Sequence, residues 1–233
     1  MKTAILLVLF TCLIYFINTQ DCTNKYTKDC PPTTTPAWPN KFQEAFEETF
    51  TYPIIGSHKT KGNFFYDWTN KRYRVDRENG QYDRYCGPIF PFRNTPCSQI
   101  VSEGVRYIYF PDKDYCCNCC SSKHGCGILK PDWMESATFV DYVTEEDGVI
   151  YEKWDKKGLQ SNFYFASAKD RTLRRIIQEP NDIQDFDTSS FRPEISDVSV
   201  FNLPQKCRKD FMCPLLSTCT AARMFADNLA FLQ

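Results

Sequence analysis

The densest group of potentially reactive side chains is a run of cysteines, Cys116, Cys117, Cys119 and Cys120, followed by Cys126. Two overlapping C-x-x-C spacings could enclose a tetrahedral zinc ion or support thiol exchange, because this spacing brings two sulfur atoms to one centre. The alternative is a set of structural disulfides. Neighbouring cysteines bridge each other only with strain, so each would then pair with a different, distant partner and tie several strands together.

The N-terminal segment favours the disulfide alternative. Residues 1–19 carry one charge, Lys2, ahead of an apolar run from Ala4 to Ile17. This pattern predicts a cleaved secretory signal peptide; an uncleaved anchor is the alternative, but a membrane span needs about 20 apolar residues. Cleavage removes Cys12 and leaves twelve of the thirteen cysteines, an even number for an oxidising compartment. We therefore expect secretion, or retention in the lumen of the secretory pathway, with neither a metal nor a cofactor.

Full oxidation would use every cysteine of the mature chain. The cysteines expected in disulfides, with their pairing left open, are Cys22, Cys30, Cys86, Cys97, Cys116, Cys117, Cys119, Cys120, Cys126, Cys207, Cys213 and Cys219. Cys22 and Cys30 could close a small loop.

Histidine chemistry is poorly supported. The two histidines, His58 and His124, lie in turn-like segments, and the G-x-S-x-G motif of a serine hydrolase does not occur. The 28 basic and 29 acidic side chains nearly balance, which argues against a broad nucleic-acid surface. We expect no catalytic residue and no nucleic-acid partner.

Acidic clusters offer two further alternatives. Glu47–Glu48 and Glu145–Asp147 could provide acid–base catalysis if buried, and Asp182, Asp185 and Asp187 could contribute oxygen ligands to calcium. Charge runs of this kind are usually solvated, so we interpret them as exposed turns and an acidic loop.

The elements that would position these groups are mainly strands. A Thr/Pro-rich extended lead-in covers residues 20–40, and a single β domain covers 41–212 with an irregular cysteine-rich insert at 111–127. An amphipathic C-terminal helix is expected over 213–233, with Pro214 in its first turn and Cys213 and Cys219 tying it down. The fold class is mainly β (α+β): a large curved antiparallel sheet or open half-barrel with a hydrophobic cleft.

Turn signals divide the β domain into short strands. Residues 72–76 alternate between apolar and charged side chains, and Asn79-Gly80 predicts a tight hairpin that returns over residues 81–85. Residues 42–52 fit a helix and a strand equally well. Further strands are expected at 62–68, 106–110, 139–143, 149–154, 162–166 and 172–178.

Short motifs in a fixed order resemble those of secreted ependymin-related proteins and the LolA-like lipoprotein-carrier fold, over about residues 38–207. The motifs are Trp38-Pro39 with Phe42, Tyr66-Asp67-Trp68, Thr95-Pro96-Cys97, the run from Gly127 to Trp133, Trp154, and Leu203-Pro204 before Cys207. The resemblance implies a half-barrel around a deep hydrophobic cleft that binds lipids without chemistry, and it implies a Cys97–Cys207 disulfide. The cysteine run at 115–126 and the C-terminal helix depart from that pattern.

Aromatic side chains are the best candidates for ligand contact, although core residues have the same pattern. We expect Tyr66, Trp68, Trp133, Trp154 and Tyr164 to lie near the cleft, with the segment Leu129–Trp133 shaping its rim. The predicted function is non-catalytic binding of a hydrophobic small molecule or lipid. The alternatives are an extracellular structural or adhesive protein with a filled core, and a secreted hydrolase. The oligomeric state is left open.

Overall fold

A computed structural model describes residues 22, 26–158 and 161–230, so the predicted signal peptide lies outside the described residues. Within them, eleven strands form one antiparallel sheet in the order β6-β5-β4-β3-β2-β1-β11-β10-β9-β8-β7. The strands are β1 (Lys41–Tyr52), β2 (Gly56–Asp67), β3 (Arg72–Arg77), β4 (Cys97–Ser102), β5 (Val105–Phe110), β6 (Tyr115–Ser121), β7 (Thr138–Thr144), β8 (Ile150–Lys157), β9 (Ser161–Ser167), β10 (Leu173–Gln178) and β11 (Asp182–Phe186).

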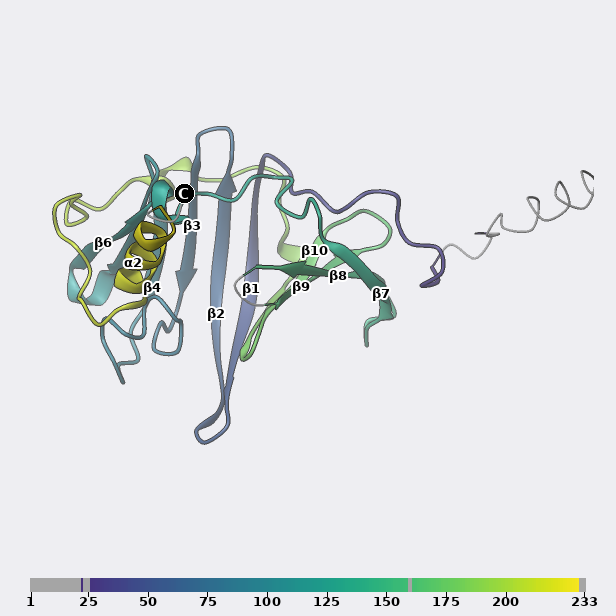
Figure 1. Ribbon diagram of the computed structural model, residues 1–233, viewed down its shortest axis with the longest axis horizontal. Coiled ribbons are helices and arrows are strands. Elements are labelled where there is room, and N and C mark those ends of the chain that lie inside the picture. The colour runs from purple at the N-terminus through teal and green to yellow at the C-terminus, as the bar shows by residue number, and fades with distance from the viewer. Residues whose placement is uncertain (1–21, 23–25, 159–160, 231–233) are drawn as a thin grey trace, which may run out of the picture.

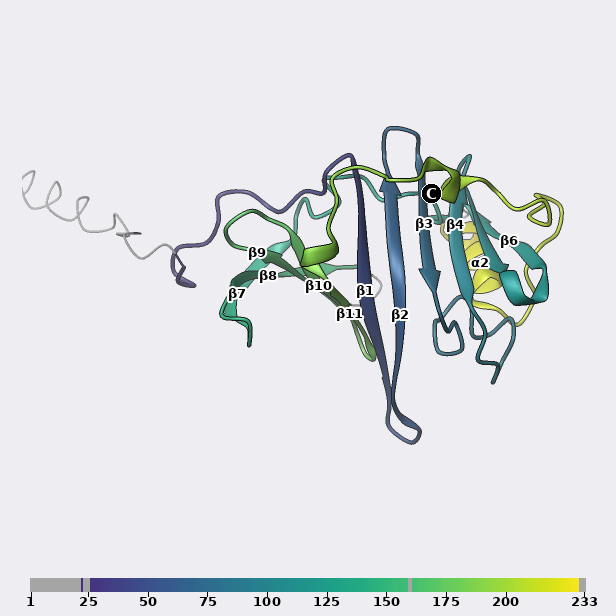
Figure 2. The same ribbon diagram turned by 180° about the vertical axis from the view of Figure 1, so that it is seen from behind.

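The sheet is open and bent. Its edges are β6 and β7, and neighbouring strands follow one another in the chain except where β11 returns to pair with β1. Strands β1 to β3 stand upright in the middle, while β7 to β10 tilt away on one side and β4 to β6 on the other (Figures 1 and 2). The expected large, curved antiparallel sheet is confirmed.

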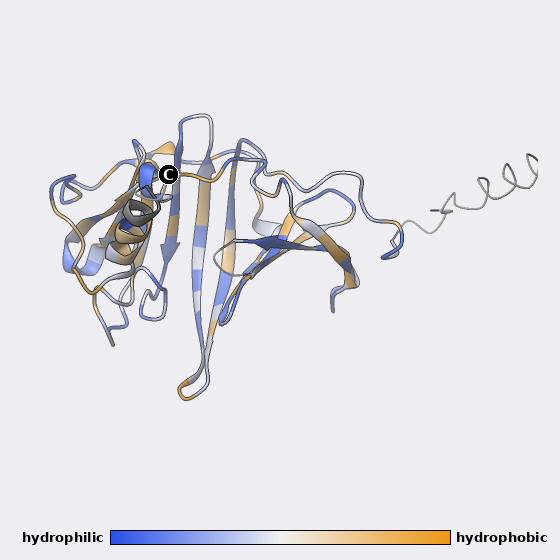
Figure 3. Ribbon diagram, viewed as in Figure 1, coloured by the Kyte–Doolittle hydropathy of each residue, from blue (hydrophilic) through white to orange (hydrophobic). Residues whose placement is uncertain are grey.

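Residues 42–52, whose sequence fits a helix and a strand equally well, form strand β1, and the burial of their side chains alternates with a period of two. Its inner face carries Phe42, Glu44, Phe46, Glu48 and Phe50, all buried, and the residues between them are more exposed. All twelve residues of β1 pair with β2, which gives the strand a partner along its whole length. Figure 3 shows β2 changing from hydrophilic bands to a hydrophobic one, in line with its sequence, which is polar up to Asn63 and continues with Phe64-Phe65.

Three expectations for the strands are wrong. Residues 81–85 form turns rather than a strand, and β3 pairs with β2 and β4 instead. Gly80 is needed there for close packing, since a Cβ at this position would lie 2.5 Å from the Cβ of Cys97. The cysteine-rich segment expected to be irregular contains the edge strand β6, and the expected acidic loop contains β11.

Six disulfides use all twelve cysteines of the described chain. They are Cys22–Cys30, Cys86–Cys97, Cys116–Cys207, Cys117–Cys213, Cys119–Cys219 and Cys120–Cys126. The Cys97–Cys207 pairing implied by the resemblance is therefore wrong. Three bridges join β6 to the segment 207–219 across sequence separations of 91, 96 and 100 residues, so they hold the end of the chain against the sheet edge.

The C-terminal helix α2 (Thr218–Ala230) begins four positions after Pro214, because Pro214 to Ser217 form a separate turn. It lies against the sheet on the side of β4 and β6 (Figure 1). Short 3₁₀ turns occupy Pro111–Lys113, Ser122–His124, Thr188–Ser190 and Val198–Phe201. Among the described residues, no helix combines the length and apolar character that a membrane span requires.

Candidate functional site

The inner face of the sheet carries a large aromatic cluster. Phe42 and Phe46 of β1, Tyr66 of β2 and Tyr73 of β3 are buried there, and Tyr164 of β9 joins them from the other half of the sheet. These side chains share one face because each strand alternates with a period of two and the sheet bends toward that face. The bend therefore brings aromatic residues from distant strands into one cluster.

Two irregular segments cover this cluster. The Trp38 amide donates to the carbonyl of Pro131 at 2.9 Å, which joins the lead-in to the segment 127–137. The Tyr66 hydroxyl donates to the carbonyl of Leu129 at 2.8 Å and anchors the same segment to β2. The backbone of the predicted rim is thus hydrogen-bonded to the inner face of the sheet.

Trp38 is the centre of the packing beneath that cover. Its ring meets Tyr66 at 5.1 Å and Trp133 at 5.4 Å, both edge to face, and its indole N–H donates to the Tyr164 hydroxyl at 2.9 Å. Edge-to-face rings at such distances fill space well and add favourable electrostatics. This part of the inner face is consequently filled by side chains.

A cavity of about 220 Å³ remains beside the filled region and opens to solvent. It exceeds the cavity of roughly 150 Å³ that accommodates a benzene molecule in an engineered protein core. Its apolar wall includes Trp38, Phe64, Tyr66, Tyr73, Val75, Leu129, Ile176 and Phe186. Its polar wall includes Arg77, Asp83, Arg84, Gln99, Arg106 and Asp182. The site has one apolar side and one charged side.

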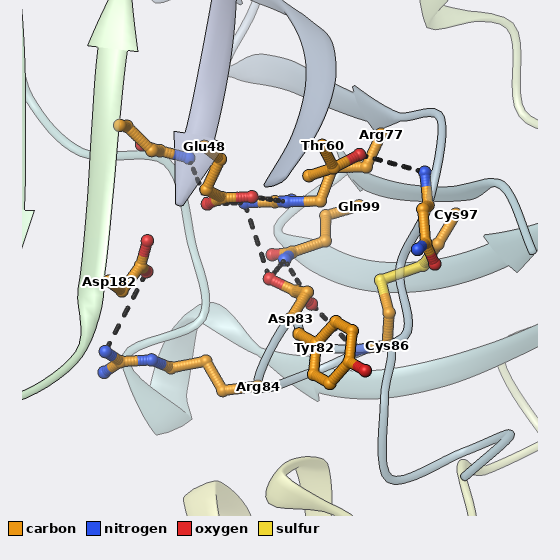
Figure 4. Close-up of polar contacts among 12 residues, drawn as sticks. Glu48, Thr60, Arg77, Tyr82, Asp83, Arg84, Cys86, Cys97, Gln99 and Asp182 are labelled. Atoms are coloured by element: carbon orange, nitrogen blue, oxygen red, sulfur yellow. Dashed lines mark hydrogen bonds and ion pairs between the residues drawn. A yellow bond between two sulfur atoms is a disulfide. The ribbon is translucent and has the colours of Figure 1, made fainter. Parts of the chain in front are cut away.

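The charged side is built on a buried ion pair between Arg77 and Glu48 (Figure 4). Two nitrogens of Arg77 donate to the two carboxylate oxygens of Glu48, with Nη2 at 2.8 Å from Oε1. Asp83 lies 3.4 Å from Nη2 of Arg77 and accepts from the Gln99 amide at 3.1 Å. Burial opposes the charge of Arg77, but Asp83 and Glu48 outweigh it and raise its pKa, so Arg77 stays cationic.

Asp182 of β11 is the unusual titrating group of the cavity. Burial raises its pKa to about 8, and the nearby charge of Glu48 acts in the same direction. The guanidinium of Arg84 lies 3.9 Å away, too far to reverse this effect (Figure 4). Asp182 is therefore a buried carboxyl with a raised pKa, in contrast with the exposed acidic loop expected from the sequence.

The five residues expected near a cleft all belong to the aromatic cluster or pack against it, in different positions. Tyr66 lines the cavity, whereas Trp133 lines a separate shallow depression on the cover segment. Trp154 is buried and donates its indole N–H to Glu152 at 3.1 Å, and Tyr164 is buried beside Trp38. Trp68 is half-buried, with the ammonium of Lys71 3.0 Å above its ring.

The charged side of the cavity was missed, although the sequence contained a signal for it. The alternation that places Tyr73 and Val75 inward continues to Arg77, and the alternation along β1 continues to Glu48. Glu48 is 0% exposed, so its interpretation as part of a solvated acidic run is wrong. A period-two reading of both strands would have placed this ion pair inside the fold.

No protein-family model and no curated protein matches the chain. Solved structures similar in fold include a conserved protein of Thermus thermophilus (TM-score 0.45, 8% identity, covering 75% of this chain and 89% of that one). They also include a LolA superfamily protein of Nitrosomonas europaea (TM-score 0.37, 8% identity, covering 71% of this chain and 91% of that one). A third is a DUF1329 family protein of Desulfovibrio piger (TM-score 0.38, 6% identity, covering 73% of this chain and 92% of that one). The chain is similar in structure to LolA-superfamily proteins at low sequence identity. The resemblance to ependymin-related proteins stays a prediction.

Proposed function

We propose that the protein is a secreted, non-catalytic binding protein whose hydrophobic ligand enters the cavity on the inner face of the sheet. The observation that carries this proposal is the apolar wall of an open cavity beside an aromatic cluster. Burial of apolar surface contributes about 25 cal/mol per Å² before the costs of binding. Disulfides on both sides of the sheet agree with an oxidising, extracytoplasmic compartment.

The cavity is too small to enclose a whole long-chain lipid. At about 220 Å³ it accommodates a ring or a short stretch of chain, and the rest of a longer ligand would extend past its mouth. Leu129 lies at that mouth, because it lines the cavity and is 49% exposed. We propose that the segment Leu129–Trp133 forms the rim and that Trp133 covers the part of the ligand outside the cavity.

An open cavity also separates this proposal from a purely structural or adhesive role, for which a completely filled inner face was expected. A secreted hydrolase is the second candidate, and the raised pKa of buried Asp182 favours it, because carboxyl groups with raised pKa values serve as general acids. The cavity lacks a free partner for that acid among the described residues. Glu48 accepts from Arg77 and Gln184, and Asp83 accepts from Gln99 and two backbone amides. We therefore favour binding.

A bulky side chain at the mouth tests the proposed function. Displacement of a fluorescent anilinonaphthalene probe by dodecanol is measured for the unmodified protein, for Leu129→Trp and for Leu215→Trp. Leu215 is 82% exposed and does not line the cavity, so it is the matched control. We expect at least ten-fold weaker dodecanol binding for Leu129→Trp and unchanged binding for Leu215→Trp. Equal binding by all three proteins would place the ligand elsewhere.

A further inference from the structure

The hairpin that joins β1 to β2 projects beyond the other loops at its end of the sheet (Figures 1 and 2). Its tip is the turn Pro53-Ile54-Ile55, in which Ile54 is 96% exposed and Ile55 is 56% exposed. Figure 3 shows this tip in the hydrophobic colour. Two large aliphatic side chains thus lie in water at the most prominent point of this end, and apolar side chains that gather on a surface mark interaction sites.

The strands below hold this tip in a fixed position. Tyr52 pairs with Gly56 directly under the turn, and the ladder continues without interruption to the other end of β1. The hydroxyl groups of Thr51 and Ser57 lie 2.9 Å apart and add a cross-strand hydrogen bond. Gly56 adopts a φ of +79°, a conformation that glycine accepts without a steric cost. The isoleucines are therefore presented by a complete two-stranded ladder.

A second apolar side chain lies at the same end of the sheet. Phe92 is 91% exposed in the connection between β3 and β4, which points in the same direction as the hairpin (Figures 1 and 2). Its φ of 61° is costly for a bulky residue, so the surrounding structure must impose it. The ring of Phe90 packs edge to face on Phe110 at 4.7 Å, and the Phe90 carbonyl accepts from the Arg93 amide at 3.3 Å. This tight turn holds Phe92 outward.

Aromatic contacts join the connection to the hairpin. The ring of Tyr82 stacks on His58 with 3.8 Å between the ring centres, and the Tyr52 hydroxyl donates to the Tyr82 carbonyl at 3.2 Å. These three rings form a collar at the base of the tip. The two apolar projections consequently belong to one supported surface of the protein.

The order of side chains along the hairpin matches the layers of a lipid membrane. Residues 50–57 contain no charged side chain, and the exposed Lys59 and Lys61 follow them on β2. Lys59 lies four residues after Ile55, about 13 Å along an extended strand. Interfacial segments bury their apolar side chains about 5–10 Å into the boundary between head groups and acyl chains. Aromatic rings suit the level above, and lysines reach out to the head groups.

The shape of this surface favours a fluid partner over a folded one. Protein partners are bound by broad patches with a polar rim and close shape complementarity. A narrow, projecting tip is enclosed on all sides only by a medium that flows around it. None of the tip residues lines the cavity on the inner face, so this surface is separate from the proposed ligand site.

We propose that the β1–β2 hairpin docks the protein on a lipid membrane by inserting Ile54 and Ile55 among the acyl chains, with Phe92 as a second contact. Burial of one isoleucine side chain favours transfer from water by about ten-fold or more. The contact is apolar, so neutral phosphatidylcholine is sufficient and salt should not weaken it.

Co-flotation with phosphatidylcholine vesicles, at low and at high salt, tests the proposal on the full mature chain. Val198→Asp is the matched control for Ile54→Asp. Val198 is 61% exposed in the 3₁₀ turn that packs on the start of β3, at the opposite end of that strand from Phe92. We expect vesicle partitioning of Ile54→Asp to fall at least about ten-fold and that of Val198→Asp to match the unmodified protein. Denaturant unfolding should be the same for all three, since the Ile54 side chain lies almost wholly in water.

Two results would overturn the proposal: unmodified protein that does not float with the vesicles, and Ile54→Asp that floats equally well. Sedimentation in the absence of vesicles reports the competing partner, a second copy of this chain. A dimer that Ile54→Asp dissociates, without vesicle binding, would assign the tip to that copy. If Ile54→Asp does not fold, Ile54→Trp decides: brominated phosphatidylcholine should quench its added fluorescence and leave that of Val198→Trp unquenched. Displacement of the fluorescent probe by dodecanol tests the cavity independently, so either proposal can fail alone.

Discussion

Replacement of Glu44 by glutamine is expected to stabilise the protein by an amount that grows with pH. Glu44 lies on the inner face of β1, is 2% exposed, and has no hydrogen-bond partner for either carboxylate oxygen within the described residues. Burial, assisted by the charge of Asp187, raises its pKa from 4.5 to about 9. The folded protein therefore keeps a proton on Glu44 where the unfolded chain has lost it.

The sign and size of the effect follow from proton linkage. When folding raises the pKa of a carboxyl, the folded protein loses stability as the pH rises above the pKa of that group in the unfolded chain. The loss levels off once the pH exceeds the pKa of the group in the folded protein. Each pH unit in that window costs about 1.4 kcal/mol. Between pH 5 and pH 8, three units, the unmodified protein should lose about 4 kcal/mol relative to Glu44→Gln. Burying the glutamine amide in Glu44→Gln has a cost that does not depend on pH. This cost would shift the free energy of unfolding of the variant equally at every pH, and the change in the difference between the two proteins from pH 5 to pH 8 would stay the same.

Denaturant unfolding with intact disulfides, followed by tryptophan fluorescence at pH 5, 6, 7 and 8, measures this difference. Glu47→Gln is the matched control, because Glu47 is the outward-facing neighbour on β1 and lies 2.6 Å from Lys59 in an exposed ion pair. Such a pair contributes less than about 1 kcal/mol, so this variant should track the unmodified protein closely. A stability gap between Glu44→Gln and the unmodified protein that is constant from pH 5 to pH 8 would refute the reasoning.

Two further outcomes are expected. Replacing both Cys119 and Cys219 by alanine should cost about 3 kcal/mol of unfolding free energy, close to the cost of about 2 kcal/mol for Cys120 and Cys126, although the sequence separations are 100 and 6 residues. The reason is that Cys117–Cys213 still joins the same two segments in the first variant, so that the lost bridge closes only a short loop beyond it. Denaturant titrations of the two double variants check this, and a loss of about 5 kcal/mol for the first variant would contradict the argument. If the protein is a binding protein, the variant Asp182→Asn should bind dodecanol as tightly as the unmodified protein. If it is a hydrolase, the unmodified protein should turn over ester or glycoside substrates, and Asp182→Asn should lose that activity.

The fold was largely predictable because most strands have a clear local pattern. Alternation over residues 72–76 and aromatic runs at 62–68 and 162–166 correspond to β3, β2 and β9. Residues 42–52 fitted two periods, and only the twelve-residue pairing with β2 selects the strand. The edge strand β6 was hidden because four cysteines in five positions suggest an irregular knot, whereas their bridges connect a regular strand to the distant segment 207–219.

The site was less predictable, because its charged side depends on contacts between distant segments. The sequence pointed to Tyr66, which lines the cavity, but the fixed position of Arg77 depends on Glu48, 29 residues earlier in the chain. Asp182 lies in a run of aspartates whose local pattern is that of a loop, and it becomes buried only because β11 inserts beside β1. Neither disulfide pairing nor this insertion follows from local pattern.

Native mass spectrometry of the protein purified from a secreting host tests the central claim most directly. If the cavity binds a hydrophobic ligand, the protein should carry a stoichiometric adduct that organic extraction releases and identifies, and Leu129→Trp should reduce its occupancy while Leu215→Trp does not. A clean mass that stays unchanged after incubation with mixed fatty acids, alcohols and phospholipids would contradict the claim.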